Sequence, residues 1–272
     1  MKIGRCLVAS DPNPLYLDFF PLVHRAWRDV VGVKLDLILI AEKIPEQYLA
    51  YRDSIILFPP IEGVHTGFQA QCARVLLPQL VRLEADEAVI ISDIDMVPMN
   101  KRYYINSISK LTSDQFVVYR ANVLREFSEI AICYNAALPE TWGDLFGKIG
   151  NLAEAAAKIK RWHDVSSYDG SHGGAGWSTD QKLLFNAVEE FNPDRITRLT
   201  DKQLGFARLD RKRMKSKLSL RQQVLVRGRY YSDCHMKRPY SEFVELNQNI
   251  VDWTTKTIMS KLLNSEIIEK LS

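Results

Sequence analysis

Short aliphatic runs alternate with amphipathic stretches in the first part of the chain. Residues 3–9 (IGRCLVA), 34–41 (KLDLILIA) and 54–60 (SIILFPP) are apolar runs of strand length, each leading into polar or turn-forming residues. Residues 15–30 have an amphipathic pattern that Pro21 interrupts. Strands that alternate with helices predict an α/β fold with a central, mostly parallel sheet covered by helices, whose ligands bind at the carboxyl ends of the strands.

The alternation continues further along the chain. Residues 67–83 carry apolar side chains at helical spacing, with a kink expected at Pro78. They lead into the strand AVIIS, which lies within residues 84–98. Further elements are expected at 115–121 and 129–138 (strands) and at 151–165 (an alanine-rich helix).

The strand AVIIS ends on two acidic residues one position apart, Asp93 and Asp95. In an extended strand, side chains two apart point the same way, so both carboxylates can converge on one divalent cation beyond the strand. Hard oxygen ligands select Mg²⁺ or Mn²⁺, and such sites usually combine one or two carboxylates with substrate phosphates. A short motif of this kind also arises by chance, and a surface strand end is the alternative interpretation.

Two later segments carry further candidate chemistry. Residues 168–188 form a glycine-rich loop that runs into a helix starting with Ser178, Thr179 and Asp180, all capping residue types. The loop lacks the sequence of a P-loop, so we interpret it as a lid or an acceptor loop. The basic segment at 206–229 is interpreted as a solvated face, with a membrane-surface or anionic-acceptor role as a secondary alternative.

Composition and charge are those of an ordinary soluble globular protein. The chain is 46% hydrophobic and 25% charged, and its net charge of +3 is too small to argue for nucleic acid. Four cysteines lack a CxxC pair, which favours reduced thiols in a cytosolic-type compartment. No run approaches a membrane span or a signal peptide. We expect a soluble cytoplasmic protein, at most peripheral to a membrane, with one domain at 1–242 and a C-terminal helical extension at 243–272 packed on it.

Several motifs, taken in order, resemble those of GT-A glycosyltransferases, most closely the retaining group that includes bacterial galactosyltransferases and glycogenin. They are ASDPN (9–13), CARVLLPQLV (72–81), AVIISDIDMV (88–97), YNAALP (134–139), STDQKLLFNAV (178–188) and RPY (238–240). The resemblance covers residues 3–240 and implies a single GT-A, Rossmann-like domain. It implies a metal-dependent enzyme that transfers a sugar from a nucleotide-sugar donor, expected to be a UDP-sugar, to a hydroxyl acceptor such as a glycan.

The resemblance also implies roles for individual residues. The donor-binding residues would be Ser10, Asp11, Asn13, Arg74, Asp93, Asn135, Lys237 and Arg238. Asp11 would accept a hydrogen bond from the imide N–H of uracil, and an Asx turn before Pro12 is an alternative that can hold at the same time. Ala137 stands where the family usually has glycine.

The metal, Mn²⁺ or Mg²⁺, would be held by Asp93, Asp95 and a third ligand near the C-terminal end. The family places a histidine six or seven residues before a Lys-Pro-Trp-like turn. Here His235 lies only three residues before Arg238 of RPY, so the third ligand is either His235 or Asp233.

Asp180 and Gln181 are the expected catalytic residues, and their roles depend on the stereochemical outcome. In an inverting enzyme Asp180 would be the general base that takes the acceptor's proton. In a retaining enzyme Asp180 would hold donor hydroxyls while Gln181 lies on the face opposite the leaving group. Retention is favoured because a helix N-terminus stabilises the ionised carboxylate and weakens it as a base. A plain capping role stays open.

Two other functions are compatible with parts of the sequence. A metal-dependent nucleotidyltransferase would also need the carboxylate pair, but the sequence has no obvious N-terminal glycine-rich triphosphate loop. A non-catalytic protein could instead bind anionic polymers through the basic residues of 208–229. A nucleic-acid partner is not expected.

Overall fold

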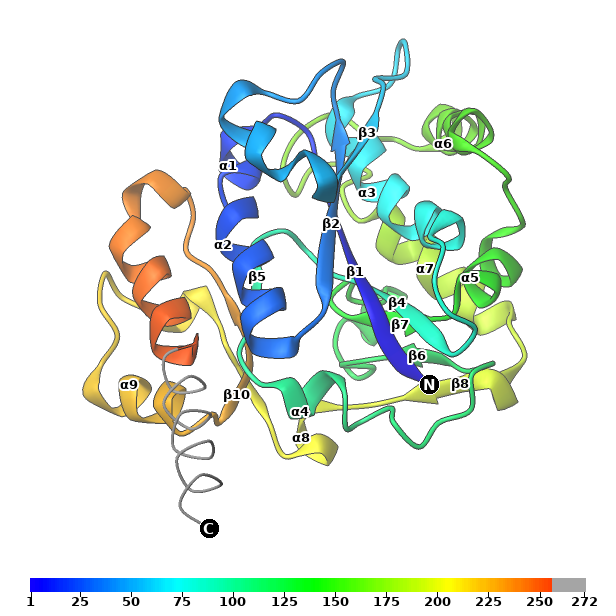
Figure 1. Cartoon of the computed structure of the whole chain (residues 1–272). Helices are drawn as coiled ribbons and strands as arrows, with labels where there is room; N and C mark the ends of the chain where they lie inside the picture. Colours follow the sequence, from blue (N-terminus) through cyan, green and yellow to red (C-terminus); the bar gives the residue numbers. More distant parts are fainter. Residues whose placement is uncertain (256–272) are drawn as a thin grey trace.

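A central seven-stranded sheet organises the computed structural model, which describes residues 1–255 (Figure 1). Across the sheet the strands are β3 (Ile55–Phe58), β2 (Lys34–Ile40), β1 (Lys2–Ser10), β4 (Glu87–Ile91), β7 (Asn135–Ala137), β6 (Phe116–Val118) and β8 (Ile196–Arg198). Neighbouring strands are parallel except that β7 is antiparallel to both β4 and β6. The sheet confirms the predicted mostly parallel α/β fold.

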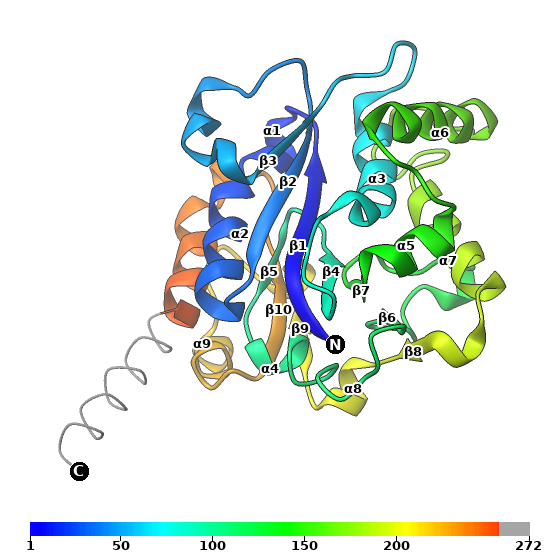
Figure 2. The same cartoon turned by 45° about the vertical axis from the view of Figure 1, so that its right-hand side comes forward.

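Helices cover both faces of this sheet, as Figure 2 shows. One face carries α1 (Pro14–Leu17), α2 (Phe20–Ala26) and the π-helix η1 (Trp27–Val31); the other carries α3 (Thr66–Leu76), α5 (Pro139–Phe146), α6 (Leu152–Val165) and α7 (Thr179–Glu190). Because both faces are covered, the central strands are buried throughout, from Cys6 to Ala9 in β1 and from Leu35 to Ile40 in β2. Two apolar clusters, one on each face, form the core.

The remaining elements are short. The α-helices are α4 (Lys101–Tyr104), α8 (Asp201–Leu204) and α9 (Leu220–Arg227). The 3₁₀ helices are η2 (Glu46–Ser54), η3 (Leu77–Leu80), η4 (Arg125–Phe127), η5 (Pro193–Arg195), η6 (Arg211–Arg213) and η7 (Tyr240–Glu242). No helix in the described part of the chain is long and apolar enough to cross a bilayer.

A second, three-stranded sheet brings the C-terminal part of the chain back to the centre. Its order is β5 (Met96–Pro98), β10 (Tyr231–His235) and β9 (Ala207–Leu209). Strand β10 is antiparallel to β5, with His235 opposite Met96. This register places the end of β10 beside the turn that contains Asp93 and Asp95.

Residues 244–255 are helical and pack on α2. Ile250 and Val251 are fully buried in the same apolar cluster as α2, and Arg25 donates to Asp252 at 2.5 Å. The predicted boundary between residues 242 and 243 stays a prediction. The rest of the expected extension, residues 256–272, lies outside the described residues.

The structure shortens three of the expected elements. The helix predicted at 67–83 ends at Leu76 and continues as η3, because Pro78 cannot donate the backbone hydrogen bond that an α-helix needs. The strand predicted at 129–138 is confined to β7, and the preceding residues form turns. The helical stretch predicted at 15–30 is divided into α1, α2 and η1, with Pro21 in the first turn of α2.

The order of the strands defines a crevice. From β1 the chain adds β2 and then β3 on one side, and it returns to add β4 on the other side of β1. The order of strand addition therefore reverses between β1 and β4. In open α/β sheets, ligands bind beyond the carboxyl ends of the strands at such a switch point. Ser10 ends β1 here, and Asp93 follows β4.

Candidate functional site

A cavity of about 290 Å³ lies at the carboxyl ends of β1 and β4. Most of the predicted site residues line it, and we call it the donor cavity after that prediction: Ser10, Asp11, Asn13, Arg74, Asp93, Asp95, Asp180, Gln181, His235 and Arg238. They come from positions far apart in the sequence. Two predicted residues, Asn135 and Lys237, do not line it.

Arg74 links two carboxylates in the wall of the cavity. Its guanidinium donates to Asp93 and, through Nε and Nη2, to Asp180 Oδ2 at 3.2 and 2.6 Å. The Asp180 side chain is only 1% exposed. Burial raises the pKa of Asp180, while Arg74 opposes that rise. Ser178, and not Asp180, is the N-cap residue of α7, so Asp180 is an internal partner of Arg74 and not a surface cap.

Asp95 belongs to a second group of charged side chains in the same cavity. Its Oδ2 lies 2.9 Å from Arg211 Nη1, 3.3 Å from His235 Nε2 and 3.5 Å from Arg238 Nε. Burial alone would raise the pKa of Asp95, but His235, Arg238 and Arg211 together hold that pKa well below its usual value. The Asp95 carboxyl is therefore ionised and shared among three cationic or hydrogen-bonding partners.

The predicted pairing of the two acidic residues is not what the structure shows. Asp93 and Asp95 lie in a turn between β4 and β5, in which Met96 N–H donates to the carbonyl of Asp93 at 3.2 Å. The alternation of an extended strand does not apply to a turn. As a result, the carboxylate of Asp93 meets Arg74 and that of Asp95 meets Arg211.

Arg211 is the residue that the sequence pattern did not reveal. The interpretation of 206–229 as a solvated face is wrong for Arg208 and Arg211, which are directed inward. Arg208 Nε donates to Asp233 Oδ2 at 2.7 Å, and Asp233 is fully buried away from the donor cavity. Of the two candidates for a third metal ligand, only His235 lines this cavity. A sequence of closely spaced arginines does not reveal which of them face inward.

Aromatic side chains of the glycine-rich loop line the donor cavity. His172 Nδ1 lies 2.6 Å from the hydroxyl of Tyr16, and the His172 and Trp177 ring centres are 4.4 Å apart. Tyr168 also lines the cavity. Trp142, the other tryptophan near these motifs in sequence, lies in the core, where its Nε1 donates to Val89. The loop therefore contributes aromatic rings to the cavity wall, and its role as a lid or acceptor loop stays a prediction.

Two of the predicted donor-binding residues make structural contacts outside the cavity. The Asn135 amide is fully buried and donates to the carbonyls of Ala131 and Ile132, both at 2.9 Å. The Lys237 ammonium lies 5.0 Å from the centre of the Phe243 ring. Their roles as donor contacts stay predictions.

The turn after β1 is pre-shaped by its own polar side chains. Asn13 caps α1 by accepting from Leu15 N–H at 3.0 Å. Asp11 accepts from Thr66 Oγ1 at 2.7 Å and, more weakly, from Asn13 N–H at 3.4 Å. The side chain of Asp11 is thus oriented into the cavity by partners on two elements, which is compatible with a further contact to a ligand.

The residues present fit a metal only in part. Asp95 and His235 offer adjacent oxygen and nitrogen ligands, whereas Asp93 is bound to Arg74. Among residues 1–255, no three Asp, Glu, His or Cys side chains gather as a metal-binding group. The arrangement therefore offers one carboxylate and one imidazole to an ion whose remaining ligands would be phosphate oxygens. Metal binding stays a prediction.

Comparison with known proteins finds distant structural similarity. No protein-family model matches the chain, and no curated protein matches it. The solved structure of the galactosyltransferase LgtC, in complex with donor and acceptor sugar analogs, is 14% identical with a TM-score of 0.46, covering 90% of this chain and 95% of that one.

Two further glycosyltransferases are similar at the same level. GlyE of Streptococcus pneumoniae TIGR4 is 12% identical with a TM-score of 0.49, covering 98% of this chain and 64% of that one. A glycosyltransferase involved in the glycosylation of the major capsid of PBCV-1 is 10% identical with a TM-score of 0.48, covering 91% and 98%. Values this low carry no information about the reaction, which has to be inferred from the residues of the cavity.

Proposed function

We propose that this protein is a glycosyltransferase that transfers a sugar from a nucleotide-sugar donor, a UDP-sugar, to an acceptor hydroxyl. The observation that carries the proposal is the donor cavity at the β1–β4 switch point, where two separate carboxylate–arginine groups face one space. A nucleotide-sugar has a base, a diphosphate and a sugar. The cavity offers Asp11 for the base, two arginines for the diphosphate, and Asp180 with Gln181 for the sugar.

The diphosphate would be recognised by Arg211 and Arg238. Both guanidinium groups reach into the cavity as partners of Asp95, and arginine binds phosphate oxygens through paired, charge-assisted hydrogen bonds. The side chain of Arg238 also lies over the Tyr16 ring, with 5.0 Å from its guanidinium carbon to the ring centre, which limits its movement. These contacts support a fixed phosphate-binding position.

A divalent cation, Mn²⁺ or Mg²⁺, would be held by Asp95 and His235, with Asp93 facing the same cavity. When bound, such an ion supplies a Lewis acid for the leaving diphosphate. Arg211 would then exchange Asp95 for a phosphate oxygen, because one carboxylate oxygen cannot satisfy the guanidinium and the ion equally well.

The sugar would lie against Asp180 and Gln181, with retention of configuration. Both oxygens of Asp180 are already engaged, Oδ2 by Arg74 and Oδ1 by the N–H of Gln181 at 2.9 Å. A carboxylate in that state is poorly placed to move toward an acceptor proton, which supports a role in orienting the donor over a role as general base.

Calorimetry with UDP, with and without Mn²⁺, tests the proposal. We expect UDP to bind at least tenfold more tightly with Mn²⁺ than without it, and Asp95→Asn to remove most of that gain. Asp86→Asn is the matched control, because Asp86 is an exposed surface carboxylate far from the cavity. No UDP binding under any condition contradicts the donor assignment, whereas equal binding with and without Mn²⁺ contradicts only the metal.

Release of UDP from UDP-glucose or UDP-galactose, in the presence of an acceptor, is the matching activity measurement. Pyrophosphate release from UTP and a sugar phosphate would instead point to a nucleotidyltransferase.

A further inference from the structure

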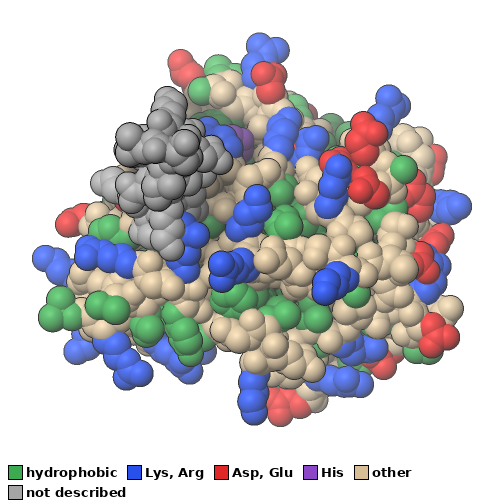
Figure 3. All heavy atoms as spheres, turned by 60° about the horizontal axis from the view of Figure 1, so that its bottom comes forward, with side chains coloured by type: hydrophobic (Ala, Val, Ile, Leu, Met, Phe, Trp, Pro, Cys, Tyr) green, Lys and Arg blue, Asp and Glu red, His purple; other side chains and the backbone are tan. Residues whose placement is uncertain are grey.

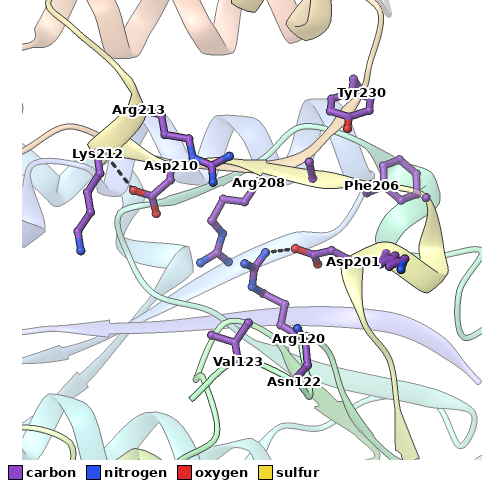
Figure 4. A pocket seen from close by; sticks show the side chains of 13 residues that line it. Arg120, Asn122, Val123, Asp201, Phe206, Arg208, Asp210, Lys212, Arg213 and Tyr230 are labelled. Atoms are coloured by element: carbon purple, nitrogen blue, oxygen red, sulfur yellow. Dashed lines mark hydrogen bonds and ion pairs between the residues drawn. The ribbon is translucent and has the colours of Figure 1, made fainter. Parts of the chain in front are cut away.

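A second cavity, of about 740 Å³, lies on the other side of the segment that carries Arg211 (Figure 4). Its walls come from the turn after β6, from α8 and β9, and from η6. Five basic side chains line it and only two acidic ones. The basic side chains are Arg120, Lys202, Arg208, Lys212 and Arg213. We refer to it as the basic cavity.

Much of this positive charge has no partner within the cavity. Arg120 pairs with Asp201, and Arg208 pairs with the buried Asp233. Lys212 and Arg213, by contrast, are exposed, and their side chains form no ion pair with any residue of 1–255. An excess of unpaired cations around a concave surface favours an anionic ligand.

One buried donor also lacks a partner here. The Nε–H of Arg120 is buried and makes no hydrogen bond within the described residues, although the Nη1 of the same guanidinium is bonded to Asp201. Buried donors are normally satisfied, so the guanidinium of Arg120 keeps unused hydrogen-bonding capacity beside the cavity. Figure 4 shows the Arg120 and Arg208 guanidinium groups directed toward each other at the floor of the cavity.

The basic cavity and the donor cavity share a wall. Along residues 208–213, Arg208, Asp210 and Lys212 line the basic cavity, whereas Arg211 lines the donor cavity and bonds Asp95. Asp210 Oδ2 also lies 3.5 Å from Nδ1 of His235, whose ring lines the donor cavity. Only the segment 208–213 would therefore separate a molecule in the basic cavity from the diphosphate of the donor.

Aromatic rings complete the lining. Tyr230 is 49% exposed, and the half-buried Phe206 also lines the cavity. Aromatic faces beside charged groups suit a ring with both apolar C–H edges and an anionic substituent, and the volume lies in the range of pockets that hold small organic ligands. We propose that the basic cavity binds the anionic part of the acceptor, a saccharide carrying carboxylate or phosphate groups, beside the wall that it shares with the donor cavity. This inference rests on the proposed glycosyltransferase function.

Binding of trigalacturonic acid, measured by calorimetry against maltotriose as the neutral probe, tests the inference. We expect trigalacturonic acid to bind and maltotriose to bind at least tenfold more weakly, with the affinity for the acid falling as salt rises. Glucose 6-phosphate is a second anionic probe that distinguishes phosphate from carboxylate as the recognised group.

The double variant Lys212→Ala/Arg213→Ala removes two exposed charges from the cavity. We expect at least a tenfold loss in trigalacturonate affinity. The control Lys215→Ala/Lys217→Ala removes the same charge from exposed positions of the same segment that do not line the cavity, and it should leave the affinity within twofold. UDP binding, measured in parallel, reports the donor cavity separately.

Each outcome bears on one claim. Equal losses in the two double variants, equal binding of maltotriose, or tighter binding of a DNA oligonucleotide than of the saccharides would overturn the anionic-acceptor assignment. If UDP binds and neither anionic probe does, only this inference fails. If UDP does not bind at all, the proposed function fails first.

Discussion

At the scale of single residues, the donor cavity depends on which carboxylate each arginine meets. Asp93 and Asp95 are two positions apart, yet Arg74 from α3 holds the first and Arg211 from η6 holds the second. Neither arginine is near its partner in the sequence. The sequence therefore indicated that Asp93 and Asp95 belong to the site, but it did not indicate which arginine each carboxylate would contact.

The pH dependence of stability tests the environment of Asp95. Because the pKa of Asp95 is lower in the folded state than the ordinary value of 3.8, its ionised form stabilises the fold. That contribution is complete above the unfolded pKa and is lost as the pH falls through the folded pKa. We expect Asp95→Asn to lower the free energy of unfolding by about 2 kcal/mol at pH 7, and the difference to shrink progressively below about pH 4.

Urea denaturation at a series of pH values from 7 to 3 measures this difference. Asp86→Asn, on the exposed surface, should show little difference at any pH. A stability gap for Asp95→Asn that stays constant across the series contradicts the assigned environment.

At the scale of elements, the glycine-rich loop and α7 act together. Gly176 has a φ of +70°, and its carbonyl accepts from both the N–H and the hydroxyl of Thr179, so it fixes how the loop enters the helix. A Cβ at Gly176 would lie 2.7 Å from the backbone of Tyr168. The loop over the cavity therefore needs glycine here for space as well as for conformation.

A pair of glycine variants separates these two requirements. Gly173 has a similar φ of +74°, but a Cβ at this position would have nothing within 4 Å, so Gly173→Ala should cost about 1 kcal/mol from conformation alone. Gly176→Ala should cost about 1–3 kcal/mol more, because the added methyl group meets backbone that cannot rotate away. Urea denaturation measures the cost, and UDP calorimetry should show weaker binding for Gly176→Ala than for Gly173→Ala. Equal effects of the two variants on both measurements would refute the steric explanation.

At the scale of the whole molecule, residues far apart in sequence complete one core. The helix at 244–255 packs against α2, and β10 pairs with β5, so the C-terminal part supports both the sheet and His235. Figure 3 shows basic side chains dispersed over the face that it presents, with no continuous stripe of the kind that follows a nucleic-acid backbone.

Two variants in the helix at 244–255 test whether it belongs to the core. Ile250 is fully buried, so Ile250→Ala should lower the free energy of unfolding by about 2–5 kcal/mol. Val244 is 40% exposed in the same helix, and Val244→Ala should change it by about 0.5 kcal/mol or less. Thermal or urea denaturation provides the comparison. If Ile250→Ala is as mild as Val244→Ala, the helix is an appendage and not part of the core.

The sequence by itself determined the α/β class, the buried strands β1, β2 and β4, and the set of polar residues that follow β1 and β4. These features are local, because hydrophobic spacing and turn residues act over a few positions. Only the tertiary structure decided that Arg211 enters the donor cavity, that Asp233 is buried against Arg208, and that a basic cavity lies behind the shared wall. Charged side chains on one short segment look alike in sequence, and the direction that each takes is set by carboxylates brought to it from elsewhere in the fold.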